Sequence, residues 1–127
     1  SLGLLTVNAL TAANGVIVPL ECEYFALRGV ALLKNTIEKV KARLNPDLSI
    51  DGVLGTMFDG RTLHGREVME RLVEAWGDTV FHTVIRRTVK FSDSTVAGEP
   101  ITSYASTSAG AEQYRQLARE CVVRWER

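Results

Sequence analysis

The stretch from residue 16 to residue 44 constrains the fold more than any other part of the chain. A short, apolar, β-branched run from Val16 to Leu20 precedes a long amphipathic segment that stops before Pro46. A strand followed by a helix is half of a βαβ unit. Because proline lacks an N–H, we expect the strand to stop at Pro19. The residues after it then lie at the carboxyl edge of a sheet, where open α/β sheets bind ligands.

The rest of the chain alternates in the same way. Apolar periodicity predicts helices and further strands in the order helix 2–13, helix 30–44, strand 50–57, helix 65–76, strand 79–85 and helix 109–125. Residues 91–108, rich in Ser, Thr and Gly, are expected to form a loop. The pattern predicts an α/β fold, in which a parallel sheet is flanked by helices. Right-handed crossovers bring all three strand ends to one edge.

The first predicted helix is almost wholly apolar. We expect it to be closely packed on both sides, as a helix inside a larger fold would be. Asn14-Gly15 is expected to end it, because both residues tolerate a left-handed conformation.

Composition restricts the classes of function. The 127 residues suit a single domain, and the 15 basic residues balance the 15 acidic ones, so no overall field attracts nucleic acid. Cys22 and Cys121 fit no metal or redox spacing, and we expect reduced, buried thiols in a cytosolic protein. The apolar run at residues 2–13 is too short to span a membrane and has no basic region before it.

Few residues carry recognisable catalytic chemistry. The sequence contains no Walker A loop, no G-x-G-x-x-G and no G-x-S-x-G motif. His64 and His82 have no paired ligand or base at a recognisable spacing, which favours structural roles. Glu21 and Glu23, at a strand end, could hold a magnesium ion, although solvated or capping carboxylates are the simpler interpretation.

Basic residues give a sharper signal. Arg61, Arg86, Arg87 and Lys90 all fall on predicted strand-end loops. Such residues could form a local anion site for phosphate oxygens. The alternative is a set of unrelated, solvated charges.

Several short motifs resemble one protein family, in the same order along the chain. Residues 1–10 are similar to the segment after the Asp-x-Pro-Pro motif of ParA/Soj-type partition ATPases, the deviant Walker A class. Residues 18–29 resemble that family's V-P-x-x-C-E-Y-F-A-L-E-G, apart from Arg28. Later matches follow at residues 44–46, 56–62, 83–85 and 108–111. The resemblance covers essentially the whole chain, residues 1–127, as one partial α/β domain corresponding to the C-terminal half of a P-loop NTPase fold.

The resemblance implies a role in DNA partition or chromosome segregation. Members of this family bind ATP and magnesium, form a nucleotide sandwich dimer and then bind DNA non-specifically. A ParB-type partner stimulates their hydrolysis of ATP. The family therefore implies a cytoplasmic, nucleoid-associated protein that does not use a membrane.

Individual positions take their expected roles from this resemblance. The family's DNA-contacting arginine in its D-x-R-T loop matches Arg61, and a second matches Lys90; we group Arg87 with them. Adenine is usually held by the loops that end the last two strands. Here these are the loop from Met57 to Asp59 and the pair Arg86 and Arg87.

The sequence also departs from the family. Ile85-Arg86-Arg87 stands where Ile-Pro-Arg is common, and Ser92 to Thr95 replaces S-E-A-P. The P-loop, its lysines and the Walker aspartates would lie before Ser1. Because phosphoryl transfer depends on those groups, we expect this chain alone neither to hydrolyse ATP nor to bind it tightly. Without a P-loop strand beside Val16, an exposed apolar edge would also favour self-association.

Other interpretations remain open. The length would allow a receiver-type signalling module, but that module needs an early strand ending in acidic residues, and this chain is expected to open with a helix. A non-enzymatic interaction or DNA-binding module derived from the ATPase is a second alternative. A MinD-like membrane-cycling ATPase is a third, since the C-terminal segment could suit a membrane surface through Arg115, Arg119, Arg124, Trp125 and Arg127.

Overall fold

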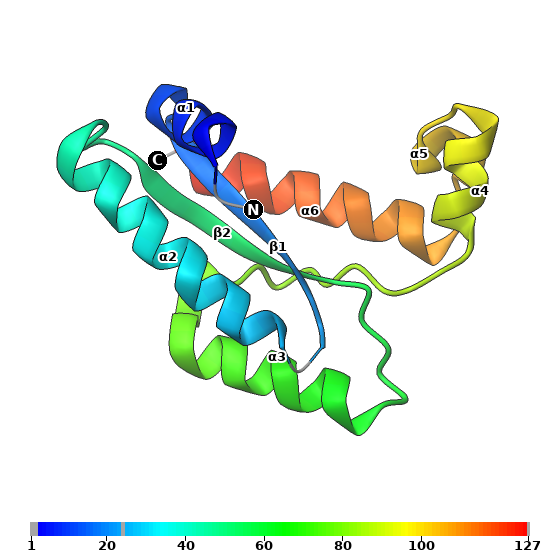
Figure 1. Cartoon of the computed structure of the whole chain (residues 1–127). Coiled ribbons are helices and arrows are strands. Elements are labelled where there is room, and N and C mark those ends of the chain that lie inside the picture. The colour runs from blue at the N-terminus through cyan, green and yellow to red at the C-terminus, as the bar shows by residue number, and fades with distance from the viewer. Residues whose placement is uncertain (1–2, 24, 127) are drawn as a thin grey trace.

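The computed structural model describes residues 3–23 and 25–126 (Figure 1). Ser1, Leu2, Arg127 and Tyr24, the last of which belongs to the family-like motif at residues 18–29, lie outside the described residues. The elements are, in order, α1 (Leu4–Ala12), β1 (Gly15–Glu21), α2 (Ala26–Arg43), β2 (Ser49–Thr56), α3 (Leu63–Trp76), the 3₁₀ turn η1 (Gly77–Thr79), α4 (Lys90–Ala97), α5 (Ile101–Tyr104) and α6 (Ala109–Trp125).

The sheet confirms the predicted βαβ unit. β1 and β2 pair in parallel, from Gly15 opposite Ser49 to Glu21 opposite Thr56, with one irregularity after Val16. α2 connects them and begins at Ala26, earlier than expected. In the part of the chain that the structure describes, the sheet has two strands.

Neighbouring residues of β2 point into two different layers. Val53 packs into the cluster of Val18, Leu20, Val30 and Leu72, on the side of α2 and α3. Leu54 packs with Phe81 and Ile85, against which Leu117 and Cys121 of α6 lie. Figure 1 shows α6 crossing the face of the sheet opposite α2 and α3. The fold is therefore α/β with a parallel sheet between helices, as the sequence predicts.

The predicted third strand at residues 79–85 is wrong as a regular strand. The segment runs beside β2 and forms isolated parallel bridges, Val53 with Val80 and Phe58 with Arg86. Thr79 belongs to η1. The pairing with β2 is irregular: the N–H groups of Phe81 and Ile85 donate to β2, whereas those of His82 and Thr83 donate to the carboxylate of Glu120 on α6, at 3.0 and 2.6 Å. The last residues of segment 80–87 nevertheless lie at the carboxyl edge of the sheet.

Pro19 does not end β1, which continues to Glu21. The N–H of Cys22 donates to the carbonyl of Thr56 at 3.1 Å. Since backbone groups alternate in direction along a strand, the nitrogen of Pro19 faces away from β2. Proline is tolerated there because β1 is an edge strand of the described sheet.

The predicted loop at residues 91–108 is also wrong, because it contains α4 and α5. The Ser and Thr residues support the helix instead of breaking it: Ser94 and Thr95 donate their hydroxyls to the carbonyl of Phe91 at 2.9 Å. Gly98, left-handed at φ 70°, ends α4. Figure 1 shows α4 and α5 as a small lobe beyond the N-terminal end of α6.

α1 differs from expectation in burial and in its ending. Leu10 is buried, but Leu4 and Leu5 are 76% and 83% exposed, so α1 is not closely packed on both sides. Its C-cap residue, Ala13, is extended, and the left-handed ending at Asn14-Gly15 does not occur. Asn45 takes that role by donating to the carbonyls of Leu10 and Ala13, at 3.0 and 2.8 Å.

Other predictions are confirmed. α6 spans residues 109–125, and α3 ends at Gly77, which adopts φ 55°. Both cysteines are free thiols; Cys22 is buried, whereas Cys121 is only partly buried.

Candidate functional site

Two loops meet where β2 and residues 80–87 end. The N–H of Phe58 donates to the carbonyl of Ile85 at 3.1 Å, and the N–H of Arg87 donates to the carbonyl of Phe58 at 3.0 Å. These two bonds bring the loop from Met57 to Asp59 beside Arg86 and Arg87. The sequence-predicted adenine residues therefore lie together at the carboxyl edge.

Two hollows adjoin these loops and share Met57 and Arg87. One, of about 390 Å³, has Glu23, Asp59 and His64 among its other lining residues. The second, of about 340 Å³, has Ile85, Arg86 and Tyr114 among its walls. Both combine apolar side chains with a few charged ones, which is the usual composition of a small-molecule site.

Met57, which lines both hollows, has a left-handed backbone at φ 51°. It is the one non-glycine residue with positive φ in the described parts of the chain. Such a conformation is unfavourable for a residue with a Cβ and is enriched at ligand sites. The residue just after β2 is therefore held in a strained position, with its side chain about half exposed.

Asp59 fixes the loop that carries Arg61. Its carboxylate accepts the N–H of Arg61 and, from the guanidinium, two further hydrogen bonds, all at 3.0 Å. Hydrogen bonds from Arg61 lower the pKa of Asp59, and the charge of Arg87 lowers it further. The side chain of Arg61 is nevertheless 91% exposed, so it remains accessible to an anion. Thr62, next in the chain, caps α3 by accepting the N–H of Gly65 at 3.2 Å.

The other predicted DNA-binding residues lie beyond this loop. Arg87 forms an ion pair with Glu23 at 3.7 Å, and both side chains are more than half exposed. Lys90 is the first residue of α4, three residues after Arg87, and its N–H donates to the hydroxyl of Thr88 at 3.3 Å. Asp59 therefore lies near both Arg61 and Arg87. The carboxylates of Asp59 and Glu23 partly offset the positive charges of these two arginines.

Acidic side chains do not assemble a metal site in the described residues. No group of three or more His, Cys, Asp and Glu that could hold an ion occurs in residues 3–23 and 25–126. Glu23 instead pairs with Arg87. The backbone N–H of His82 donates to Glu120 at 3.0 Å, and the structural role expected for its side chain stays a prediction.

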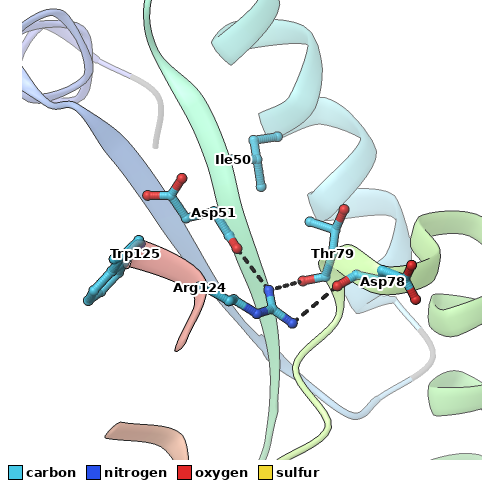
Figure 2. Close-up of a pocket in the computed structure, with 6 residues that line it drawn as sticks. All are labelled: Ile50, Asp51, Asp78, Thr79, Arg124 and Trp125. Carbon is cyan, nitrogen blue, oxygen red and sulfur yellow. Dashed lines mark hydrogen bonds between the residues drawn. The ribbon is translucent and has the colours of Figure 1, made fainter. Parts of the chain in front are cut away.

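A third hollow, of about 290 Å³, lies at the opposite end of β2, and Arg124 is one of the residues that line it (Figure 2). The guanidinium of Arg124 donates to the carbonyls of Asp51, Thr79, Asp78 and Val80 at 2.8–3.1 Å. It also lies 4.0 Å from the ring centroid of Phe81. A Cβ on Gly52 would overlap that ring, which explains the glycine in mid-strand. Its donors are used within the protein, so this hollow is an unsuitable ligand site.

The sequence interpretation missed this arrangement and treated Arg124 as a possible membrane contact. The neighbouring arginines of α6 also make internal contacts: Arg115 donates to the carbonyl of Ser106 at 2.9 Å, and Arg119 donates to Glu112 at 2.7 Å. No helix of the described residues is long and apolar enough to cross a membrane. Arg127 lies outside the described residues.

Comparisons with known proteins agree with this fold. Residues 1–50 match the family model described as an AAA domain. The chain is 60% identical over 125 residues to an uncharacterized protein of Mycobacterium tuberculosis, covering 98% of this chain and 39% of that one. It is 50% identical over 124 residues to the chromosome-partitioning ATPase Soj of Treponema pallidum, covering 98% of this chain and 49% of Soj.

A solved structure gives the same result in three dimensions. Cobyrinic acid a,c-diamide synthase from Mycobacterium smegmatis, with a bound ATP analog and magnesium, superposes with a TM-score of 0.78 at 38% identity. The match covers 98% of this chain and 45% of the synthase. The chain thus spans about half the length of the relatives it matches. The resemblance to ParA/Soj-type partition ATPases and the P-loop NTPase-like α/β fold are confirmed.

Proposed function

We propose that this chain is the C-terminal half of a ParA/Soj-type ATPase that segregates DNA. The observation that carries the proposal is the meeting of the Met57–Asp59 and Arg86–Arg87 loops at one edge, in a chain half of whose residues are identical to Soj. In this proposal the whole protein binds ATP, dimerises, binds DNA of any sequence and is stimulated by a ParB-type partner. It acts in the cytoplasm on the nucleoid.

The residues at the carboxyl edge suit one part of a nucleotide. The hollow of about 340 Å³ has an apolar floor at Ile85 and Met57 and positive charge at Arg86 and Arg87. A nucleobase needs such a mixed wall, with Asp59 available at the neighbouring hollow. The phosphates and magnesium do not fit the described residues, because these contain no cluster of metal ligands and the sequence contains no Walker A loop. In this proposal, the residues that bind the phosphates and magnesium belong to another segment or chain.

DNA phosphates are the proposed ligands of Arg61, Lys90 and Arg87. The side chain of Arg61 is exposed, so a DNA phosphate can contact its guanidinium directly. Asp59 holds the Arg61 side chain at two points, which limits its freedom before DNA arrives. Contacts of this kind give affinity that falls steeply with salt and that does not depend on base sequence.

The test is a chimera in which this chain replaces the matching half of Treponema pallidum Soj. We expect the chimera to hydrolyse ATP, and to retain labelled duplex DNA with ATP and magnesium but not with ADP. The 127-residue chain alone, the control, should release no phosphate above background. A folded chimera that neither hydrolyses ATP nor binds DNA would contradict the proposal, as would ATP hydrolysis by the chain alone.

One alternative is a non-enzymatic module derived from the ATPase. It predicts that the chain alone binds DNA or a partner with no nucleotide dependence. The MinD-like alternative is less consistent with the structure, because Arg115, Arg119 and Arg124 are bound within the protein.

A further inference from the structure

Side chains on one face of α6 bind the backbone of residues 78–86. Glu120 lies seven residues after Gln113, and Arg124 four residues after Glu120, so all three side chains project from the same face. Each binds the backbone of that segment: Gln113 at Arg86, Glu120 at His82 and Thr83, and Arg124 at Asp78, Thr79 and Val80.

The amides of this segment are shared between β2 and α6. The N–H groups of Phe81 and Ile85 donate to the carbonyls of Val53 and Gly55 in β2, both at 2.9 Å. The N–H of Arg86 instead donates to Oε1 of Gln113, at 3.0 Å. Gln113 is thus the last of the three α6 contacts before the chain reaches Arg87.

The three contacts differ in what they hold. The side chains of Arg124 and Glu120 are about four-fifths buried or more; Arg124 holds the start of the segment and Glu120 holds its middle. Gln113 is neutral and partly exposed, and it holds a residue at the edge. Arg87, the next residue, is bound through its N–H to Phe58 and through its side chain to Glu23. Gln113 therefore fixes the peptide N–H of Arg86, the residue from which the chain enters Arg87.

We infer that Gln113 is a positioning residue: by accepting the Arg86 N–H, it sets the orientation of Arg86 and Arg87 for binding a phosphate-bearing ligand. The inference rests on the proposed function for the identity of that ligand, a DNA duplex. The hydrogen bond itself can be tested without any ligand.

The first experiment measures amide exchange by NMR in the 127-residue chain. Gln113→Met keeps the length of the side chain but removes the acceptor. We expect exchange at Arg86 to accelerate by about tenfold, with Phe81 and Ile85 unchanged, because local opening needs only that bond to break. Gln113→Glu retains an acceptor oxygen and should restore protection. Gln116→Ala, at an exposed position of α6, is the matched control and should change none of these rates.

The second experiment measures DNA affinity in the Soj chimera. Gln113→Met should weaken duplex binding severalfold at an unchanged melting temperature, whereas Gln116→Ala should not. Unchanged exchange at Arg86, or no rescue by Gln113→Glu, would overturn the inference. So would a Gln113→Met chimera that binds DNA as tightly as the unmodified one. If exchange responds as expected and the unmodified chimera binds no DNA, the proposed function and the assigned ligand fail, and the hydrogen bond to Arg86 stands as a structural contact alone.

Discussion

Arginines at the two ends of β2 behave in opposite ways. At one end, the side chain of Arg124 is 14% exposed, and its guanidinium donates to four backbone carbonyls and lies against Phe81. At the carboxyl end, the side chain of Arg61 is 91% exposed and binds a carboxylate two residues away. The difference separates a residue that holds the fold together from one that is free to bind a ligand. A count of basic residues along the sequence contains no such distinction.

The hydrogen-bond acceptors that each arginine binds explain the difference in exposure between Arg124 and Arg61. Backbone carbonyls at the ends of β2 and η1 converge on one point, and a planar guanidinium with several donors can satisfy them together. At the carboxyl edge the acceptors are side-chain carboxylates: Asp59 pairs with Arg61, and Glu23 pairs with Arg87. Surface pairs of this type contribute little to stability and can exchange partners.

The largest expected effect is a loss of stability at the end of β2 that Arg124 binds. Arg124→Ala leaves four carbonyls without their donor, and we expect the free energy of unfolding in urea to fall by about 2–4 kcal/mol. Arg119→Ala, on the same helix but 63% exposed, should change it by less than about 0.5 kcal/mol. Equal losses of unfolding free energy in the two variants would show that the backbone contacts of Arg124 stabilise the fold no more than an exposed ion pair does.

The second effect concerns pH. Burial alone would raise the pKa of Glu120, but hydrogen bonds from Thr83 and from the amides of His82 and Thr83 lower it below the ordinary 4.5. Because the folded pKa is lowered, the stabilisation is complete above pH 4.5 and is lost as pH falls through the folded pKa.

Glu120→Gln should therefore be less stable than the unmodified chain by about 1–2 kcal/mol at pH 7, and the gap should narrow in acid. Thermal unfolding at a series of pH values measures it. A gap that stays constant down to pH 3 would contradict the assignment.

The third prediction concerns the exposed end and is made in the Soj chimera. Arg61→Ala and Lys90→Ala should each weaken duplex DNA binding severalfold and reduce the slope of log K against log salt by about one. Melting temperatures should not change, in contrast to Arg124→Ala. Unchanged salt slopes in both variants would remove these residues from the DNA site.

The smallest effect concerns the pair between Glu23 and Arg87. Glu23→Gln removes a carboxylate 3.7 Å from the guanidinium, so Arg87 becomes more available to phosphate. We expect DNA affinity in the chimera to rise by about twofold at low salt and the gain to disappear at high salt, where screening is complete. Asp47→Asn, in the turn between α2 and β2, removes an equal charge elsewhere and is the control. A loss of affinity in Glu23→Gln would mean that the pair positions Arg87 instead of competing for it.

Local signals in the sequence were sufficient to predict where α6 begins and where α3 ends. Ser108 accepts the N–H of Ala111 and begins α6, and Gly77 ends α3 with positive φ. The loops of the candidate site were also predictable, since parallel strands must end at one edge. Both features depend on residues that are close in the sequence or on general rules of topology.

Long-range contacts explain the errors. Residues 79–85 look like a strand, but the amides of His82 and Thr83 donate to Glu120, more than 30 positions later, and the pairing with β2 stays irregular. Asn45 likewise caps α1 from the far end of α2. A side chain that binds a distant backbone gives no periodic signal, and the role of Arg124 was invisible for the same reason.

The position of Pro19 in β1 has a consequence for chains that meet one another. Its ring, rather than an N–H, faces the open side of the sheet, so an incoming strand would find a donor missing midway along that border. A second copy could therefore not extend the ladder without interruption, whereas a segment shaped to leave that position unbonded could do so. Pro19 therefore leaves one position of this border without a donor, whichever strand pairs with it.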